Sequence, residues 1–492
     1  MQSVADWAQL NFGTCELGDK RRTKRLVQVA EQVGNHPSAS LPNQIERWSD
    51  LKAAYRLFDG DEVTFEAIAR PHWELTKQAA KGRCLVIGDT TEFDFGKDRE
   101  IEGIGPTGNG SGQGFLLHNA LLVHAESEEI IGVAGQTIHY RKKKPKSKKR
   151  ENSAQIKKRK RESEVWGTVI DQIGKPRNGE TQNGETQNGE TQNGETQNDE
   201  AQNKEAQGDD VEYVHVFDRG GDNFEVYCRL LENHGQWVIR ASKMSRYVLA
   251  GESEERLPLK DYLPQLQTLG HYTLSLRARP DQAARDAQLE VRVGRIKIPC
   301  PRHVSPWVRA RNQPPIAMNV VEVIEVDAPQ GATPIRWVLF TSLSVMTFED
   351  AWTVIGYYEL RWLVEEYHKA IKTGCATESR QLKSASRLEA FVGLTSVVAI
   401  RLLQLKSLAR TNPEVPAQRV IPRMWLQMLK LARPGLNRVH DLTVGQFYRE
   451  VAKLGGFLGR KGDGDPGWIT LWRGWEKLNT YVFVASKLKI NL

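Results

Sequence analysis

Residues 358–372 read Tyr358-Glu-Leu-Arg361-Trp-Leu-Val-Glu365-Glu-Tyr-His-Lys-Ala-Ile-Lys372. On a helix with about 100° per residue, Tyr358, Arg361, Glu365 and Lys372 fall within roughly 60° of one another. A solvated helix usually spreads its charges as pairs of opposite sign. The shared narrow face indicates instead a site that holds a metal ion and a polyanion together, with an exposed salt-bridge face as the alternative.

Composition narrows the classes of protein. The chain has 492 residues, enough for two to four domains, and a formal net charge of +8, which favours a polyanionic partner, although a ribosome-like protein or a membrane surface fits the charge as well. No apolar run reaches the length of a membrane span, and the N-terminus lacks the segments of a signal peptide. We therefore expect a cytoplasmic, nucleoid-associated protein of a prokaryote, without a membrane partner.

The cysteines argue against disulfides and structural zinc, because they are scattered, odd in number and form no Cys-x-x-Cys pair. They are Cys15, Cys84, Cys228, Cys300 and Cys375.

Residues 1–70 have the pattern of short amphipathic helices. One helix is expected from Asp6, and a second from Asp19, with a cluster of cations at residues 20–25 in its first turns. Cations at a helix N-terminus oppose the helix dipole, so the cluster predicts an external anion such as DNA phosphate. A solvated basic face is the alternative. The candidate DNA contacts are Arg21, Arg22 and Arg25.

From residue 84 the pattern changes to that of strands. Residues 84–88 form a short apolar strand that ends at Asp89, and residues 115–124 and 130–138 form a hairpin. The glycine-rich residues 105–114 lack the Gly-Lys-Ser/Thr ending of a phosphate loop and lead into a strand rather than a helix. We interpret them as a flexible loop.

Two polar segments follow the hairpin. Residues 141–161 are dense in Lys and Arg, and residues 176–210 contain an imperfect Asn-Gly-Glu-Thr-Gln repeat with almost no apolar residue. Both compositions predict disorder, and the basic run adds a candidate for non-specific contact with nucleic acid. A helix is expected between them, at residues 163–174.

Ordered structure is expected again from residue 211. A strand at residues 211–217 ends at Asp218, and a helix at 223–233 and a strand at 237–240 follow. Residues 241–345 have an all-β pattern, and the chain beyond Phe348 is largely helical.

Asp89, Asp218 and Glu365 form the candidate catalytic set. A strand ending in Asp, a hairpin, a helix, a second strand ending in Asp and a later helix with Glu match the ribonuclease-H-like layout, in which the first and fourth strands are neighbours. Carboxylate oxygens are the ligands that Mg²⁺ and Mn²⁺ prefer, and a pair of such ions promotes phosphodiester chemistry. Taken singly, an aspartate at a strand end is more often a turn former or a helix cap.

The spacing Tyr-x2-Arg-x3-Glu-x6-Lys is the signature of the insertion-sequence-four family of transposases, and the rest of the chain resembles the Tn-five type within that family. The likeness includes Asp89-Thr-Thr, Asp218-Arg, Arg-Trp-Val-Leu-Phe-Thr-Ser at residues 336–342 and Leu-Trp-Arg-Gly-Trp-Glu at residues 471–476. It covers most of the chain.

The resemblance implies an α/β fold: a ribonuclease-H-like catalytic core with an all-β insertion, flanked by helical domains. Residues 1–70 would bind the transposon ends and residues 71–407 would form the catalytic domain, with the β-rich insertion at 241–345. Residues 408–492 would form a dimerisation domain. The triad of carboxylates would hold Mg²⁺, for which Mn²⁺ can substitute.

The implied reaction is cut-and-paste transposition by a homodimer on paired ends of double-stranded DNA. Water nicks one strand, its 3′-hydroxyl attacks the opposite strand to form a hairpin, water reopens the hairpin, and the 3′-hydroxyl attacks target DNA. Trp337 is similar to the residue on which a flipped base stacks, and Trp362 would support the distorted strand. The implied phosphate contacts are Tyr358, Arg361, Lys372, Lys369 and Arg240.

The sequence departs from the family pattern between residues 141 and 210, where the basic run and the repeat lengthen the chain. This departure questions the spacing of that segment but not the triad. A catalytically inactive DNA-binding regulator derived from the same family and a stand-alone metal nuclease are the alternatives. The filled triad favours an active enzyme, and the N-terminal basic helix argues against a simple nuclease.

Overall fold

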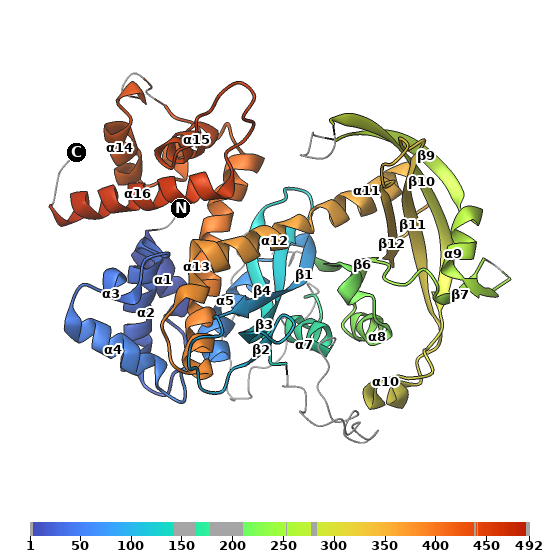
Figure 1. The fold of residues 1–492 in the computed structure, drawn as a ribbon, viewed down its shortest axis with the longest axis horizontal. Coiled ribbons are helices and arrows are strands. Elements are labelled where there is room, and N and C mark those ends of the chain that lie inside the picture. The colour runs from blue at the N-terminus through green and yellow to red at the C-terminus, as the bar shows by residue number, and fades with distance from the viewer. Residues whose placement is uncertain are drawn as a thin grey trace, which may run out of the picture.

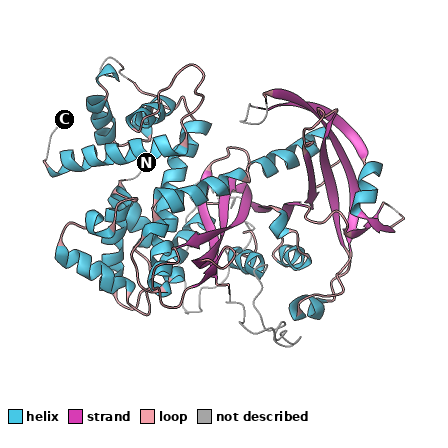
Figure 2. Ribbon diagram, in the orientation of Figure 1, coloured by secondary structure: helices cyan, strands magenta, loops and turns pink. Residues whose placement is uncertain are grey.

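The computed structural model describes residues 3–141, 164–177, 210–251, 253–276, 283–436, 439 and 441–488. Helices at both ends of the chain lie on one side of the molecule, and the strands form a central group and a second group beyond it (Figures 1 and 2). Nearly all of the predicted basic run and of the predicted repeat lies outside the described residues.

The N-terminal region is helical, as predicted. Asp19 caps the second helix by accepting the backbone N–H of Arg21, while Ser3 and Thr64 cap the first and fifth in the same way. The helices are α1 Val4–Phe12, α2 Lys20–Asn35, α3 Leu41–Gln44, α4 Trp48–Phe58 and α5 Phe65–Gln78. The predicted domain boundary after residue 70 falls inside α5.

The central sheet has the strand order β4-β3-β1-β5-β6, with β1–β5 and β5–β6 parallel and the other pairs antiparallel. The predicted adjacency of the two aspartate-bearing strands is therefore confirmed. Strands β1 and β5 are largely buried, as parallel strands covered on both faces are. The strands are β1 Gly82–Asp94, β2 Gly105–Thr107, β3 Gly112–His124, β4 Ile130–His139, β5 Val211–Phe217 and β6 Gln236–Arg240.

Two sequence-based expectations about this sheet are wrong. Asp89 does not end its strand, because β1 continues to Asp94 through antiparallel pairing with β3. Residues 105–114 are not simply a loop, since β2 pairs with the start of β3 in a short hairpin. Gly108 and Gly110 in its turn have φ of 55° and 100°, so glycine allows the turn that we interpreted as flexibility.

Helices cover both faces of the central sheet. The largest hydrophobic cluster joins one face to α5, α12 (Trp362–Lys369) and α13 (Ala385–Thr411), and the other face packs against α7 and α8. Helix α7 spans Glu164–Ile173 and α8 spans Phe224–Glu232, which confirms the two helices predicted at these places.

The β-rich part is continuous with the central sheet, because β12 pairs with β6 and so extends it to 12 strands. It is not purely β, since two short helices, α9 and α10, cover the face opposite α11. Its elements are β7 Tyr247–Ala250, β8 Glu255–Pro258, α9 Leu259–Tyr262, β9 Gln267–Leu276, β10 Arg285–Ile298, α10 Pro306–Arg311, β11 Ile316–Val326 and β12 Arg336–Thr341.

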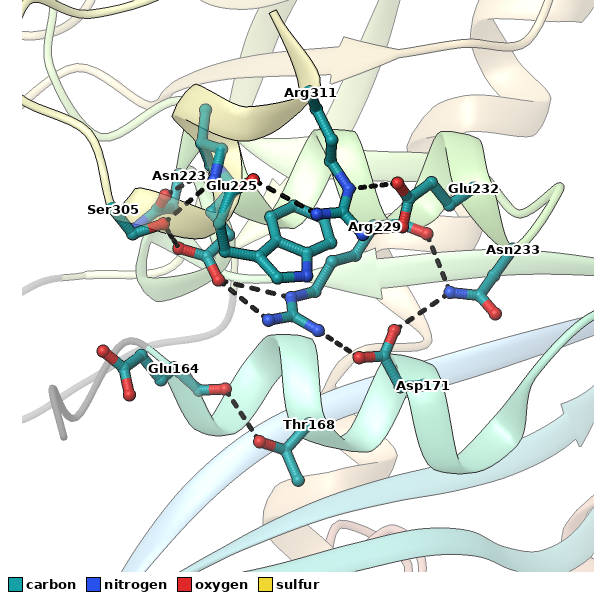
Figure 3. Close-up of polar contacts among 12 residues, drawn as sticks. Glu164, Thr168, Asp171, Asn223, Glu225, Arg229, Glu232, Asn233, Ser305 and Arg311 are labelled. Carbon is teal, nitrogen blue, oxygen red and sulfur yellow. Dashed lines mark hydrogen bonds and ion pairs between the residues drawn. The ribbon is translucent and has the colours of Figure 1, made fainter. Parts of the chain in front are cut away.

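A polar clamp gives the β-rich part a second attachment to the core (Figure 3). Arg229 of α8 bonds to Glu225 and to Asp171 of α7, and Arg311 of α10 bonds to Glu232. The Trp307 ring lies between the two guanidinium groups, with their Cζ atoms 4.1 Å and 3.4 Å from its centroid. The clamp therefore fastens α10 onto α8, and α8 onto α7.

The residues predicted as one helix, 358–372, form three segments. The first is the end of helix α11 (Phe348–Glu359), which stops before Arg361; the Arg361 N–H bonds to the Tyr358 carbonyl in a tightened turn. The second is α12 (Trp362–Lys369), and the third is a π-helical turn, Ala370–Gly374. The break coincides with a change of packing surface, because α11 contacts β5, β6 and β10 whereas α12 contacts β1 and β3 (Figure 1).

Helix α13 (Ala385–Thr411) runs through the centre of the protein. It is long and apolar enough to cross a membrane, but 88% of its most apolar stretch is buried inside the protein, which is the environment of a core helix. The predicted boundary after residue 407 falls inside it. The C-terminal helices that follow are α14 Arg423–Ala432, α15 Val444–Leu454 and α16 Trp468–Lys487.

Buried histidines make the fold sensitive to acid. Burial lowers the pKa of His72 to about 4 and that of His215 to about 3. Below pH 6.5 the unfolded chain binds protons at these two positions that the folded chain does not, so stability falls as the pH falls from 6.5 toward 4.

We predict that acidification from pH 7 to pH 5 lowers the free energy of unfolding by about 2 kcal/mol for each of these histidines. Urea denaturation at both pH values measures the loss. His72→Phe should remove its own share of the difference, while His234→Gln, at an exposed position, should leave it unchanged. A pH dependence that His72→Phe does not reduce would contradict the assignment.

Candidate active site

Parallel pairing brings Asp89 and Asp218 together. The last pair between β1 and β5 is Gly88 with Phe217, and each aspartate is the next residue of its strand segment. The Asp218 carboxylate accepts the backbone N–H of Gly220 at 2.7 Å, which fixes its orientation at the start of a short 3₁₀ turn.

Glu365 of α12 completes the group through Arg361. The Arg361 guanidinium donates to Glu365 Oε1 at 2.6 Å and lies 3.5 Å from Asp89 Oδ2. Burial, and after it the charge of Asp218, raise the pKa of Asp89 to about 6, and Glu365 adds to that shift, while Arg361 opposes it. The charges of Asp218 and Glu365 therefore both affect Asp89, and the Arg361 guanidinium lies between Asp89 and Glu365.

The donor set suits a hard divalent cation, because it consists of carboxylate oxygens. Within the described part of the chain, however, no three His, Cys, Asp or Glu side chains gather closely enough to hold a metal ion. The Arg361 guanidinium, which is bonded to Glu365 and lies against Asp89, occupies a position between these two carboxylates. A metal ion would have to displace Arg361 from at least one of these carboxylates.

An aromatic group continues the site from Arg361 toward the β-rich part. The Tyr358 ring, which is buried, lies with its centroid 5.4 Å from that of Trp337, at 66°, and 5.9 Å from Arg361 Cζ. Trp337 is half-buried. Arg240 of β6 pairs with Leu339, two residues beyond Trp337 on β12, so Arg240 and Trp337 are on the same face of the sheet.

The remaining predicted phosphate contacts lie along α12 and the π turn. Lys372 pairs with Glu378 at 3.4 Å. Lys369 lies 4.9 Å above the ring of Trp362, which is 51% exposed. Lys369 and Trp362 each lie one helical turn from Glu365.

The arginines of α2 have partners inside the protein. Arg21 bonds to Asp19, Arg22 to the Leu17 carbonyl, and Arg25 to Asp50 at 2.8 Å. Asp19 both caps the helix and neutralises Arg21, and the external anion expected for this cluster stays a prediction. Arg21 still has 90% of its side chain exposed, so it remains able to contact a second anion.

Sequence reasoning missed the polar residues behind the carboxylates. Thr90 bonds to His118 at 2.8 Å, and Asn119 contacts His368 at 3.0 Å, all in the core or close to it. A signal was available: His118 and Asn119 interrupt a strand whose other residues from 115 to 123 are apolar, and a polar pair in a buried strand needs partners.

Comparison with protein families identifies both ends of the chain. Residues 4–63 match a model described as transposase DNA-binding, and residues 397–489 match the transposase Tn5 dimerisation domain. These matches support a Tn5-like transposase. They also support DNA binding and a homodimer, while membership of the insertion-sequence-four family stays a prediction. The three carboxylates lie between the two matched regions.

Proposed function

We propose that this Tn5-like protein is an active DDE transposase, which cuts an insertion sequence out of DNA and joins it to a target. One observation supports this proposal most directly: parallel pairing of β1 with β5 puts Asp89 beside Asp218, and Arg361 links Asp89 to Glu365. These residues lie in the sequence between two ends that match transposase models. The strand order β4-β3-β1-β5-β6 supports a ribonuclease-H-like core, with the β-rich part as its insertion.

Asp89, Asp218 and Glu365 would hold Mg²⁺, or Mn²⁺ in its place. Such ions, when bound in a pair, activate water or a 3′-hydroxyl and stabilise the leaving oxygen of the phosphodiester. The raised pKa of Asp89 supports this role, because a carboxylate whose ionisation is opposed by burial and by a neighbouring carboxylate gains most from a nearby cation.

In this proposal Arg361 exchanges one kind of anionic partner, the carboxylates, for another, a DNA phosphate. In the isolated chain it neutralises Glu365 and Asp89. A DNA phosphate offers it a bidentate partner of equal charge, and its transfer to the phosphate frees the carboxylates for the metal. Arg361 would thus hold the DNA backbone at the position where the carboxylates act.

Trp337 and Tyr358 would shape the cleaved end. A hairpin intermediate bends the DNA sharply, and a base turned out of the stack relieves that bend when an aromatic ring receives it. Trp337 is half-buried and oriented by the buried Tyr358, so its exposed face is available. Arg240, on the same face, would contact the adjoining phosphate, and Trp362, Lys369 and Lys372 would contact the strand along α12.

The two ends would assemble the complex. Arg21, Arg22 and Arg25 lie in the region matched by the DNA-binding model and would contact the transposon end. Two copies, each bound to one end, would pair through the C-terminal region, in the cytoplasm of a prokaryote.

We predict that Asp89→Ala and Glu365→Ala abolish cleavage and retain DNA binding, because each removes a carboxylate of the site and no part of the end-binding region. The substrate is a duplex with the element's own end, taken from DNA that flanks the gene, incubated with and without Mg²⁺. A denaturing gel that resolves hairpins separates the products, and Asp98→Ala, at an exposed position outside both matched regions, is the control.

Mg²⁺-dependent nicks followed by a hairpin in the unchanged protein would establish the reaction. Retarded but uncut duplex would favour the inactive regulator instead. Cleavage at the normal rate by Glu365→Ala would remove Glu365 from the mechanism.

We predict that Arg361→Gln strengthens Mn²⁺ binding to the DNA-free protein by roughly tenfold, because the metal no longer displaces a charge-assisted hydrogen bond of about 1.5 kcal/mol. Paramagnetic resonance of free Mn²⁺ gives the dissociation constant. Arg83→Gln, which removes an ion pair with Glu212 at the other end of β1, is the matched control. Unchanged or weaker binding by Arg361→Gln would show that Arg361 does not compete with the metal.

We predict that the exposed stripe of α16 contacts the second copy. Tyr481 and Val484 of α16 and Leu488, the residue after the helix, are 41%, 48% and 66% exposed and recur at the spacing of one helical face, within the matched dimerisation region. Tyr481→Glu combined with Val484→Glu should convert dimers to monomers in light scattering with end DNA present, while Gln418→Glu should not. Dimers that persist in the double variant would place the interface elsewhere.

A further inference from the structure

A row of polar side chains crosses the central sheet at the level of Asp89. Asp89 pairs with Asn119, and Asn119 pairs with Gln136, so the three residues occupy one level of β1, β3 and β4. Side chains at paired positions are on the same face of a sheet. Asn119 and Gln136 are 0% and 1% exposed. Such burial of two amides costs free energy unless every bond is made.

These amides form a directed chain of hydrogen bonds that ends on α12. Trp73 Nε1 donates to Gln136 Oε1 at 3.2 Å, Gln136 Nε2 donates to Asn119 Oδ1 at 2.6 Å, and Asn119 Nδ2 lies 3.0 Å from His368 Nε2. An amide nitrogen only donates, so the histidine nitrogen accepts and the ring is neutral. Burial, with the charges of Lys372 and Arg361, lowers the pKa of His368 to about 3, which keeps it neutral.

The last bond of this chain helps to fix how α12 lies on the sheet. His368 follows Glu365 by three residues, so the two side chains share one face of α12. Asn119, which contacts His368, is paired in the sheet with Asp89. Asp89 is in turn linked to Glu365 through Arg361. A slip of α12 by one residue would rotate Glu365 by about 100° and break the bond between Asn119 and His368.

The rotation of helix α12 on the sheet is weakly determined by the helix itself. It has eight residues, it follows the tightened turn at Arg361, and it leads into a π turn. Short helices have little stability of their own, and both flanking turns depart from the α-helical bonding that would otherwise set the register. The contact of Asn119 with His368, together with the bond from Gln136 to the Tyr367 hydroxyl, therefore helps the sheet to set the rotation of α12.

We propose that Asn119 and His368 are positioning residues, which set the register of α12 so that Glu365 meets Asp89 and Asp218. The proposal rests on the proposed function, because it gives the carboxylates the task of binding a divalent cation. The proposed role requires no contact of either residue with the cation or the DNA. Their contribution is measured by metal affinity, and not by stability alone.

The test is titration of the full-length protein with Mn²⁺, followed by paramagnetic resonance. Asn119→Leu and His368→Phe keep the shape of the side chain and remove the donor or the acceptor. Each should weaken Mn²⁺ binding by about tenfold or more, the size typical of residues that orient metal ligands. His368→Gln keeps an acceptor oxygen and should stay within about threefold of the unchanged protein.

A second Asn–His pair in the chain provides the matched control. Asn11 Oδ1 lies 2.8 Å from His72 Nδ1, and both are buried between α1 and α5. Asn11→Leu should lower the melting temperature as the Asn119 variant does and leave Mn²⁺ binding unchanged. If Asn119→Leu or His368→Phe fails to fold, the double variant takes its place, since it leaves neither a donor nor an acceptor unpaired in this pair.

The outcomes separate this proposal from the proposed function. Wild-type Mn²⁺ affinity in folded Asn119→Leu and His368→Phe, with loss of binding in Asp89→Asn, would overturn the positioning role alone. Equal losses in His368→Gln and His368→Phe would overturn it as well, because the acceptor would then not be what matters. Unchanged binding in Asp89→Asn would overturn both, since the carboxylates would not bind the cation.

Discussion

The parallel pairing of β1 with β5 is the constraint on which the rest of the site depends. It buries two apolar strands side by side and ends at Gly88 and Phe217, so the two aspartates that follow are forced together. Their charges repel in a poorly solvated place, and the pKa of Asp89 rises to about 6. A cation must compensate for this repulsion, and in the isolated chain Arg361 does so.

Helices α11 and α12 place Arg361 and Glu365 next to these aspartates. Tyr358 packs against Trp337 of the β-rich part. Glu365, seven residues after Tyr358 in the sequence, is linked through Arg361 to Asp89 of the central sheet. The tightened turn at Arg361 lets the chain satisfy both surfaces. The bond between Asn119 and His368 then helps to fix the rotation of α12, so the departure from regular helix geometry and the buried polar network serve the same placement.

The β-rich part and the N-terminal helices are held at defined positions relative to the carboxylates. Pairing of β6 with β12 and the clamp of Figure 3 attach the sheet that carries Trp337. On the other side, the buried Arg380 donates to carbonyl groups of Pro37 and Cys375, which joins the matched DNA-binding region to the segment that follows α12. In the proposed function, contacts of this kind would let DNA held at one end of the protein meet the carboxylates in a fixed geometry.

The sequence by itself determined the elements whose signal is local. The alternating strand β5 and the amphipathic helices α7 and α8 could be predicted, because periodicity depends on neighbours in the chain. The two aspartates could also be assigned to adjacent strands. Only the tertiary structure decided that β1 continues past Asp89, that residues 105–114 make a hairpin, that the helix around Arg361 breaks, and that Asn119 bonds to His368. Each of these depends on a partner far away in sequence: antiparallel pairing extends β1, the packing surface changes where the helix breaks, and a bond across 249 positions helps to set its rotation.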